Sequence, residues 1–136
     1  MNLLRSLLYE FQYSKYVRQA PFYLMRHFGK RSYYKTENVD FALGKYSFNA
    51  RYRPIAYALF CKPEDYQAAS RRYLPHPPRE FIIEKVSSRY FKNGESITLY
   101  TLMKRSMFKS RAGGETGPSA SKEYWSLMSK FDDKNS

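Results

Sequence analysis

The chain contains little cysteine, histidine, glycine or acid. Among 136 residues there are one Cys, two His, six Gly and twelve Asp and Glu. A single cysteine cannot form a disulfide within the chain, and one cysteine with two histidines cannot complete the four ligands of a structural zinc ion. Because free cysteine is usually buried, we expect Cys61 to be an inert core thiol in an intracellular, reducing compartment.

Long apolar runs and catalytic motifs are also missing. No stretch approaches the roughly 20 apolar residues of a transmembrane helix, and the N-terminus has no signal-peptide core. Gly113, Gly114 and Gly117 are not followed by the Lys-Ser/Thr pair of a phosphate-binding loop. Neither a zinc-binding His-Glu-x-x-His motif nor a nucleophilic-serine elbow occurs. We therefore expect a protein that is not an enzyme and that uses no metal or cofactor.

Positive charge and aromatic rings are abundant. The chain has 24 Lys and Arg, a formal net charge of +12, 14 Tyr and 10 Phe. Residues 1–118 contain 21 basic and 9 acidic side chains, whereas residues 119–136 contain three of each. The charge excess therefore belongs to the main body of the chain, where it favours anionic partners.

Apolar residues recur at helical spacing along most of the chain. The first apolar stripe consists of Leu3, Leu4, Leu7, Leu8 and Phe11. A second stripe is rotated relative to the first and consists of Tyr16, Val17, Ala20, Leu24 and Phe28. The change of face predicts a bend or break between residues 12 and 21, where Ser14 could cap a new helix or Pro21 could begin one.

The remaining pattern also predicts helices. We expect them over residues 36–43 with Thr36 as cap, over 52–61, over 63–73, over 78–93, and over 95–109 with Ser96 as cap. Residues 95–109 could also form a strand, because Ile97, Leu99 and later apolar positions alternate briefly, but the length of the segment favours a helix. The predicted fold is all-α: a compact single domain over residues 1–109, with about five or six short helices. Residues 110–136 are predicted to be a flexible Gly/Ser-rich extension that contains a short amphipathic helix.

The middle of the chain, over roughly residues 15–105, contains Tyr34-Lys35-Thr36, Val39, Ala42-Leu43, Tyr52, residues 55–60 and Glu64. In these positions it resembles a family of small uncharacterised bacterial proteins. It implies a compact helical domain in a bacterial cytoplasm. The family has no established activity, so the resemblance assigns no catalytic or binding residue.

Nucleic acid is the partner that the composition favours most. Cations can bind phosphates, and exposed rings beside them can stack on bases. The alternative is that the tyrosines belong to the edges of the core and the cations only solubilise the domain. The candidate nucleic-acid contacts are Arg26, Lys30, Arg31, Tyr33, Tyr34, Arg51, Tyr52, Arg53, Arg71, Arg72, Lys104 and Arg105.

Two other binding modes remain open. The C-terminal helix could bind an acidic or other protein partner in a groove, or it could fold back on its own domain or stay disordered. Its candidate partner-binding residues are Tyr124, Trp125, Leu127, Met128 and Phe131. The N-terminal stripe could instead lie on an anionic membrane surface. We place nucleic acid first, a protein partner second and a membrane surface third.

Overall fold

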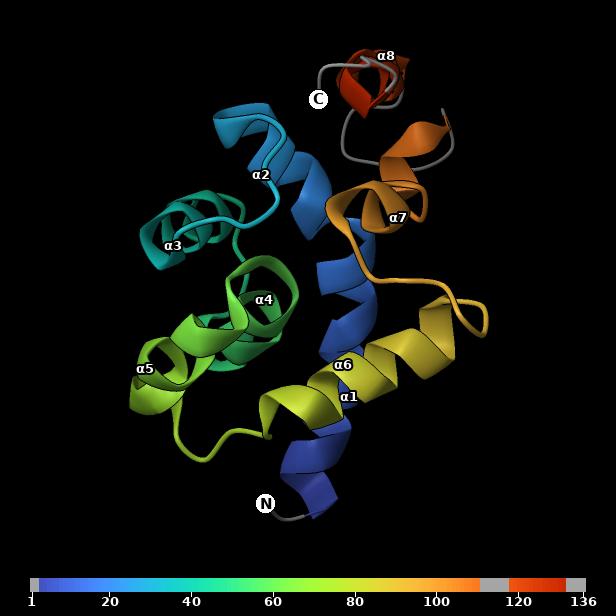
Figure 1. The fold of residues 1–136 in the computed structure, drawn as a ribbon. Helices are drawn as coiled ribbons and strands as arrows, with labels where there is room; N and C mark the ends of the chain where they lie inside the picture. The colour runs from blue at the N-terminus through green and yellow to red at the C-terminus, as the bar shows by residue number, and fades with distance from the viewer. Residues whose placement is uncertain (1–2, 111–117, 132–136) are drawn as a thin grey trace.

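The computed structural model describes residues 3–110 and 118–131, and every regular element within these ranges is a helix (Figure 1). The predicted all-α class is confirmed. The described residues form eight α-helices rather than five or six, together with five short 3-10 helices. Seven of the eight lie within residues 3–103, and the eighth is α8, in the segment predicted to be an extension. The helix predicted over residues 63–73 is a single short α-helix, α5, between η2 and η3.

The elements of the first half of the chain are α1 (Leu3–Arg18), α2 (Ala20–Phe28), α3 (Thr36–Lys45), η1 (Ala50–Tyr52), α4 (Arg53–Phe60), η2 (Pro63–Asp65), α5 (Tyr66–Ser70) and η3 (Arg71–Tyr73). Those of the second half are α6 (Arg79–Tyr90), α7 (Leu99–Met103), η4 (Met107–Lys109), α8 (Pro118–Met128) and η5 (Ser129–Phe131). In Figure 1 the long α1 runs behind α6, α4 lies near the centre, and α8 packs at the far end beside α2 and η4. None of the described helices is both long and apolar enough to cross a bilayer.

The predicted break between the first two helices is confirmed, and Tyr16, Val17, Ala20 and Leu24 of the second stripe are buried. The first stripe, however, is not the face that α1 buries. Leu7 and Phe11 are 44% and 77% exposed. The buried side is built from Tyr9, Tyr13, Tyr16 and Val17, at helical spacing. On this face Lys15 and Arg18 no longer point inward, so α1 continues past Ser14 to Arg18 and Pro21 stands in the first turn of α2.

The helices that follow show what the sequence could and could not locate. Gly29 ends α2 with φ of 74°, in the left-handed region that favours glycine. α3 buries Val39, Ala42 and Leu43 as expected, although its N-cap is Lys35 rather than Thr36. α4 is the most completely buried helix, as its apolar composition predicted.

The C-terminal elements complete the same core. The helix expected within residues 95–109 is the shorter α7, and its cap is Thr98 rather than Ser96: Thr101 N donates to Thr98 Oγ1 at 3.1 Å, and Thr98 N donates to Thr101 Oγ1 at 2.8 Å. Most of the predicted Gly-rich linker falls on residues 111–117, outside the described residues. The division at residue 109 stays a prediction, but the helix beyond it is not separate from the core, because Ala120 and Tyr124 are buried in it.

Tyrosine dominates this core. Nine of the 14 tyrosines are buried, and six of them rank among the largest fully buried side chains of the described residues. Their rings meet one another edge to face, as between Tyr9 and Tyr52 at 5.1 Å. Most of the chain's tyrosines are therefore structural, which weakens the case for reading each as a base-stacking ring.

Burial of a phenol requires a partner for its hydroxyl, and the partners here are mostly backbone carbonyls of distant segments. The hydroxyls of Tyr34, Tyr66 and Tyr124 donate to Gly29 O at 2.6 Å, Pro77 O at 2.5 Å and Met103 O at 2.8 Å. Longer bonds run from Tyr9 to Arg51 O and from Tyr16 to Asn49 O. Tyr13 is the exception, since its buried hydroxyl has no hydrogen-bond partner among the described residues.

Two tyrosine-to-phenylalanine variants separate the hydroxyl from the ring. Tyr124→Phe leaves the buried Met103 carbonyl without its donor, so we expect the free energy of unfolding to fall by about 1–3 kcal/mol. Tyr13→Phe removes a hydroxyl that has no partner, and it should be neutral or stabilising. Urea denaturation followed by circular dichroism measures both. Equal losses in the two variants would contradict the proposed role of the hydroxyl bonds.

Candidate nucleic-acid interface

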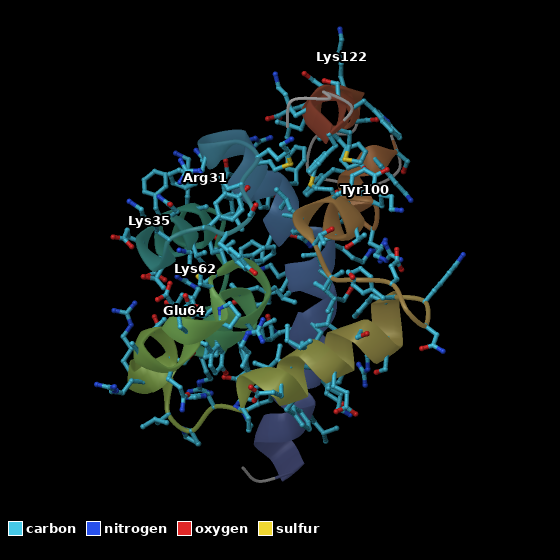
Figure 2. All side chains as sticks on the ribbon, viewed as in Figure 1. Arg31, Lys35, Lys62, Glu64, Tyr100 and Lys122 are labelled. Atoms are coloured by element: carbon cyan, nitrogen blue, oxygen red, sulfur yellow. The ribbon has the colours of Figure 1, made fainter. Side chains whose placement is uncertain are left out.

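A groove of about 870 Å³ opens between the segment before α3, the end of α4, one side of α6 and the segment leading into α7. Its apolar lining includes Leu59, Ile83, Ile97 and Leu99. Charged and aromatic residues complete it: Lys30, Arg31, Tyr33, Arg79, Glu95, Tyr100 and Phe131. Three cations thus face one acid. Figure 2 labels Arg31 and Tyr100, which come from two walls of the groove.

The first wall is the short segment between α2 and α3. Its two ends are fixed to the core, because Gly29 turns the chain out of α2 and Tyr34 turns it back. Tyr34 N donates to Phe60 O at 2.7 Å, while its hydroxyl donates to Gly29 O. Burial raises the pKa of the Tyr34 phenol, so the hydroxyl remains a donor. The residues between these anchors, which include Lys30, Arg31 and Tyr33, lie at the surface.

Arg31 is held on this wall without being buried. Its Nε donates to Phe28 O at 3.1 Å and its Nη1 donates to Asn38 Oδ1 at 3.1 Å. These two bonds hold the exposed guanidinium of Arg31 in one position between α2 and α3. Tyr33 beside it is 48% exposed, so its ring is available to a ligand.

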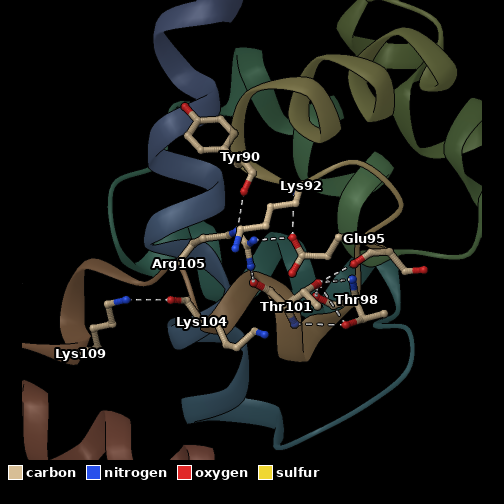
Figure 3. A network of polar contacts seen from close by, with 9 residues as sticks. Tyr90, Lys92, Glu95, Thr98, Thr101, Lys104, Arg105 and Lys109 are labelled. Atoms are coloured by element: carbon tan, nitrogen blue, oxygen red, sulfur yellow. Dashed lines mark hydrogen bonds and ion pairs between the residues drawn. The ribbon is translucent and has the colours of Figure 1, made fainter.

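The second wall is held by Arg105, which was predicted to contact nucleic acid but serves the fold (Figure 3). Its guanidinium donates to Tyr90 O, to Thr101 O at 2.7 Å and to Glu95 Oε1 at 2.5 Å, and it lies 4.2 Å from the centre of the Phe91 ring. Glu95 also accepts from Lys92 N at 3.1 Å. That backbone bond and the charge of Arg105 lower the pKa of Glu95. Arg105 therefore joins the end of α6, the turn after it and α7.

Arg79 contributes the third cation. It begins α6, is half-buried and lines the groove. Its Nε atom is buried and has no hydrogen-bond partner among the described residues. A guanidinium binds carboxylates and phosphates through paired N–H groups. The guanidinium of Arg79 is thus a candidate partner for an anionic ligand in the groove.

Cys61 also borders the groove, but it is not a nucleophile. Its side chain is buried, as predicted, and burial raises the pKa of the thiol to about 12. The thiolate, which is the reactive form, is thus disfavoured at neutral pH. No group of three or more His, Cys, Asp or Glu within the described residues is placed to bind a metal ion.

Several of the other predicted contacts are core residues. Tyr52 packs edge to face on Tyr9, and Arg53 is buried with its Nη1 3.2 Å from Asp40 Oδ1. Tyr57 donates to the same Asp40 oxygen at 2.5 Å. Tyr34, Tyr52 and Arg53 cannot meet a base or a phosphate in this structure, because their side chains are enclosed.

Arg26 connects α2 to the C-terminal helix. Its Nε and Nη2 donate to the two oxygens of Glu123 at 2.9 and 2.7 Å, and its Nη1 donates to Tyr46 Oη at 3.0 Å. On α8, Tyr124 is buried, Leu127 and Met128 are half-buried, and Trp125 remains 57% exposed. Of the three outcomes left open for this helix, the structure shows the one in which it folds back on its own domain.

The remaining predicted cations lie outside the groove. Arg71 and Arg72 border a smaller hollow beside α3, where Arg72 Nη2 donates to Asp40 Oδ2 at 3.0 Å. Arg51 is exposed on η1. Lys104 places its ammonium 5.0 Å from the centre of the Tyr100 ring, beside the second wall. The groove therefore gathers Lys30, Arg31 and Tyr33 from the predicted set and leaves the others elsewhere.

A model for a family of unknown function, DUF6559, matches residues 5–127. The chain belongs to this family. The match extends beyond the predicted resemblance at both ends and includes most of α1 and α8. No curated protein and no solved structure matches the chain. The bacterial origin that the resemblance implied stays a prediction, and membership in the DUF6559 family assigns no activity.

Three groove residues of this family member were missing from the predicted set. Arg79 was not among the candidate residues, and Tyr100 stood in a segment whose structure was ambiguous. Phe131 was assigned only to partner binding. Lys30, Arg31 and Tyr33 were selected because cations and aromatic rings are adjacent in the sequence. Tyr100 has cations nearby as well, at Lys104-Arg105, but the sequence does not show that Tyr100 and Arg79 line the same groove.

Removing the Arg105 side chain should loosen the second wall. Arg105→Ala takes away three hydrogen bonds, one of them to a charged partner, so we expect a loss of about 2–3 kcal/mol in the free energy of unfolding. Amide hydrogen exchange of residues 95–100 should quicken as well. Lys104→Ala, which removes an exposed neighbouring cation, should cost less than about 0.5 kcal/mol. Equal losses of stability and equal exchange rates in the two variants would show that Arg105 does not hold the second wall in place.

Proposed function

We propose that the protein is a non-enzymatic, intracellular nucleic-acid-binding protein and that the groove is its binding site. The observation that carries the proposal is the convergence of Lys30, Arg31 and Arg79 with the exposed rings of Tyr33 and Tyr100 along one apolar groove. In proteins that bind single strands, cations bind the phosphates and aromatic side chains stack on the bases. The groove supplies both at one place, and a net charge of +12 supports attraction over longer range.

Four of the other predicted cations are paired with acids, which favours the groove over those positions. Arg26, Arg53, Arg72 and Arg105 are paired with Glu123, Asp40 or Glu95. Such pairs partly cancel the charge that a phosphate would meet. Arg79, by contrast, brings an unmatched buried Nε to the groove.

Binding of another protein is the second candidate, and one observation favours it. Leu7 and Phe11 stand exposed on α1, where an apolar partner could cover them. The same pair could rest on a membrane surface, the third candidate. Neither residue lines the groove, so these candidates concern a different face of the molecule.

Oligonucleotide binding at several salt concentrations tests the proposed function. We expect a fluorescein-labelled single-stranded oligonucleotide to bind, and the affinity to fall as salt rises. In the double variant Arg31→Ala/Arg79→Ala the slope of log K against log salt should become shallower by about 1.4, because each lost phosphate contact on a single strand removes about 0.7. Fluorescence anisotropy measures the binding.

A matched double variant controls for net charge. Arg51→Ala/Lys122→Ala removes two exposed cations outside the groove and should keep nearly the full salt slope. Absence of binding at low salt would overturn the proposal. Equal weakening by the two double variants would show that the charge acts without the groove.

A further inference from the structure

One aromatic ring in the groove comes from the far end of the described chain. Phe131, the last residue of η5, lies with its ring centre 5.2 Å from that of Tyr100, at an interplanar angle of 54°. Lys30 Nζ is 5.6 Å from the centre of the same phenyl ring and donates to Lys130 O at 3.3 Å. The ring therefore occupies a place bordered by an aromatic residue of one wall and a cation of the other.

An unpaired nucleobase would find the same surroundings favourable. It offers a planar π face, which stacks on aromatic side chains in proteins that bind single strands and which attracts a neighbouring cation. Arg31 and Arg79 line the same groove and could bind the phosphates on either side. A base within a duplex is covered by its neighbours on both faces, so it could not enter this place.

Phe131 is held more weakly than the helix that carries it. Its ring meets Tyr100 and the ammonium of Lys30, and exposed cation–ring contacts contribute little. α8 itself is fixed independently, by the Tyr124 hydroxyl on Met103 O and by the Arg26–Glu123 ion pair. The ring can thus leave the groove while α8 stays in place.

We propose that Phe131 fills a base-stacking subsite against Tyr100 and that an unpaired base of a single strand replaces it. This inference rests on the proposed function. It adds that the nucleic acid is single-stranded and that Phe131 competes with one of its bases. The protein accordingly prefers single strands, and its own C-terminal segment lowers its affinity for them.

Phe131→Ala tests the replacement directly. We expect it to bind the labelled single strand about two- to tenfold more tightly than the unaltered protein, the range that an aromatic pair contributes to an equilibrium constant. Phe131→Tyr, which keeps a competing ring, should bind like the unaltered protein. Affinity for a duplex of the same sequence should not change, and Tyr100→Ala should weaken single-strand binding. Circular dichroism checks that each variant is folded.

Labelling of lysines provides a readout without nucleic acid. Phe131→Ala should raise the rate at which an amine-reactive reagent modifies Lys30, relative to the exposed Lys35, as followed by mass spectrometry. If Arg31→Ala/Arg79→Ala weakens binding but Phe131→Ala does not strengthen it, the inference is wrong and the proposed function stands. If no variant binds a single strand, both are wrong. Unchanged Lys30 labelling would also contradict the placement of Phe131.

Discussion

The structure depends on the burial of tyrosine rings whose hydroxyls must still find hydrogen-bond partners. A phenylalanine core could pack the same rings, but it would not determine where the connecting segments run. Here the hydroxyls of Tyr34, Tyr66 and Tyr124 donate to backbone carbonyls at the end of α2, before α6 and in α7. Each bond satisfies a buried donor and at the same time fixes a loop or an incoming helix.

The groove is a consequence of this arrangement. Tyr34 anchors one wall through its amide and its hydroxyl, and Arg105 anchors the other through bonds to three segments. Between these anchors the chain presents cations and rings that take no part in the core. Tyr34 and Arg105, two residues of the predicted nucleic-acid interface, therefore hold the walls of the groove in place.

The helical class, the break before α2, the Gly29 terminus and the buried α4 followed from local patterns in the sequence. The inward face of the first half of α1 did not, because both its leucines and its tyrosines recur at helical spacing. The tyrosine face is the one that meets the rest of the chain, where the hydroxyls of Tyr9 and Tyr16 donate to Arg51 O and Asn49 O. The groove was only partly predictable for a similar reason. Lys30 to Tyr33 are adjacent in the sequence, whereas Arg79, Tyr100 and Phe131 come together only through contacts between distant helices.

Spectrophotometric titration of the tyrosines is the most direct test of a core held by phenol groups. Burial raises the pKa of Tyr13, Tyr66 and Tyr124 to about 12, and those of Tyr16, Tyr34 and Tyr57 rise as well. Because the folded state disfavours the ionised phenols, stability should decline as the pH rises above the ordinary value of 10.0. We predict that these six tyrosines ionise only together with unfolding, seen as a loss of the helical circular dichroism. Ionisation of all 14 tyrosines near pH 10 in a protein that remains helical would contradict the account.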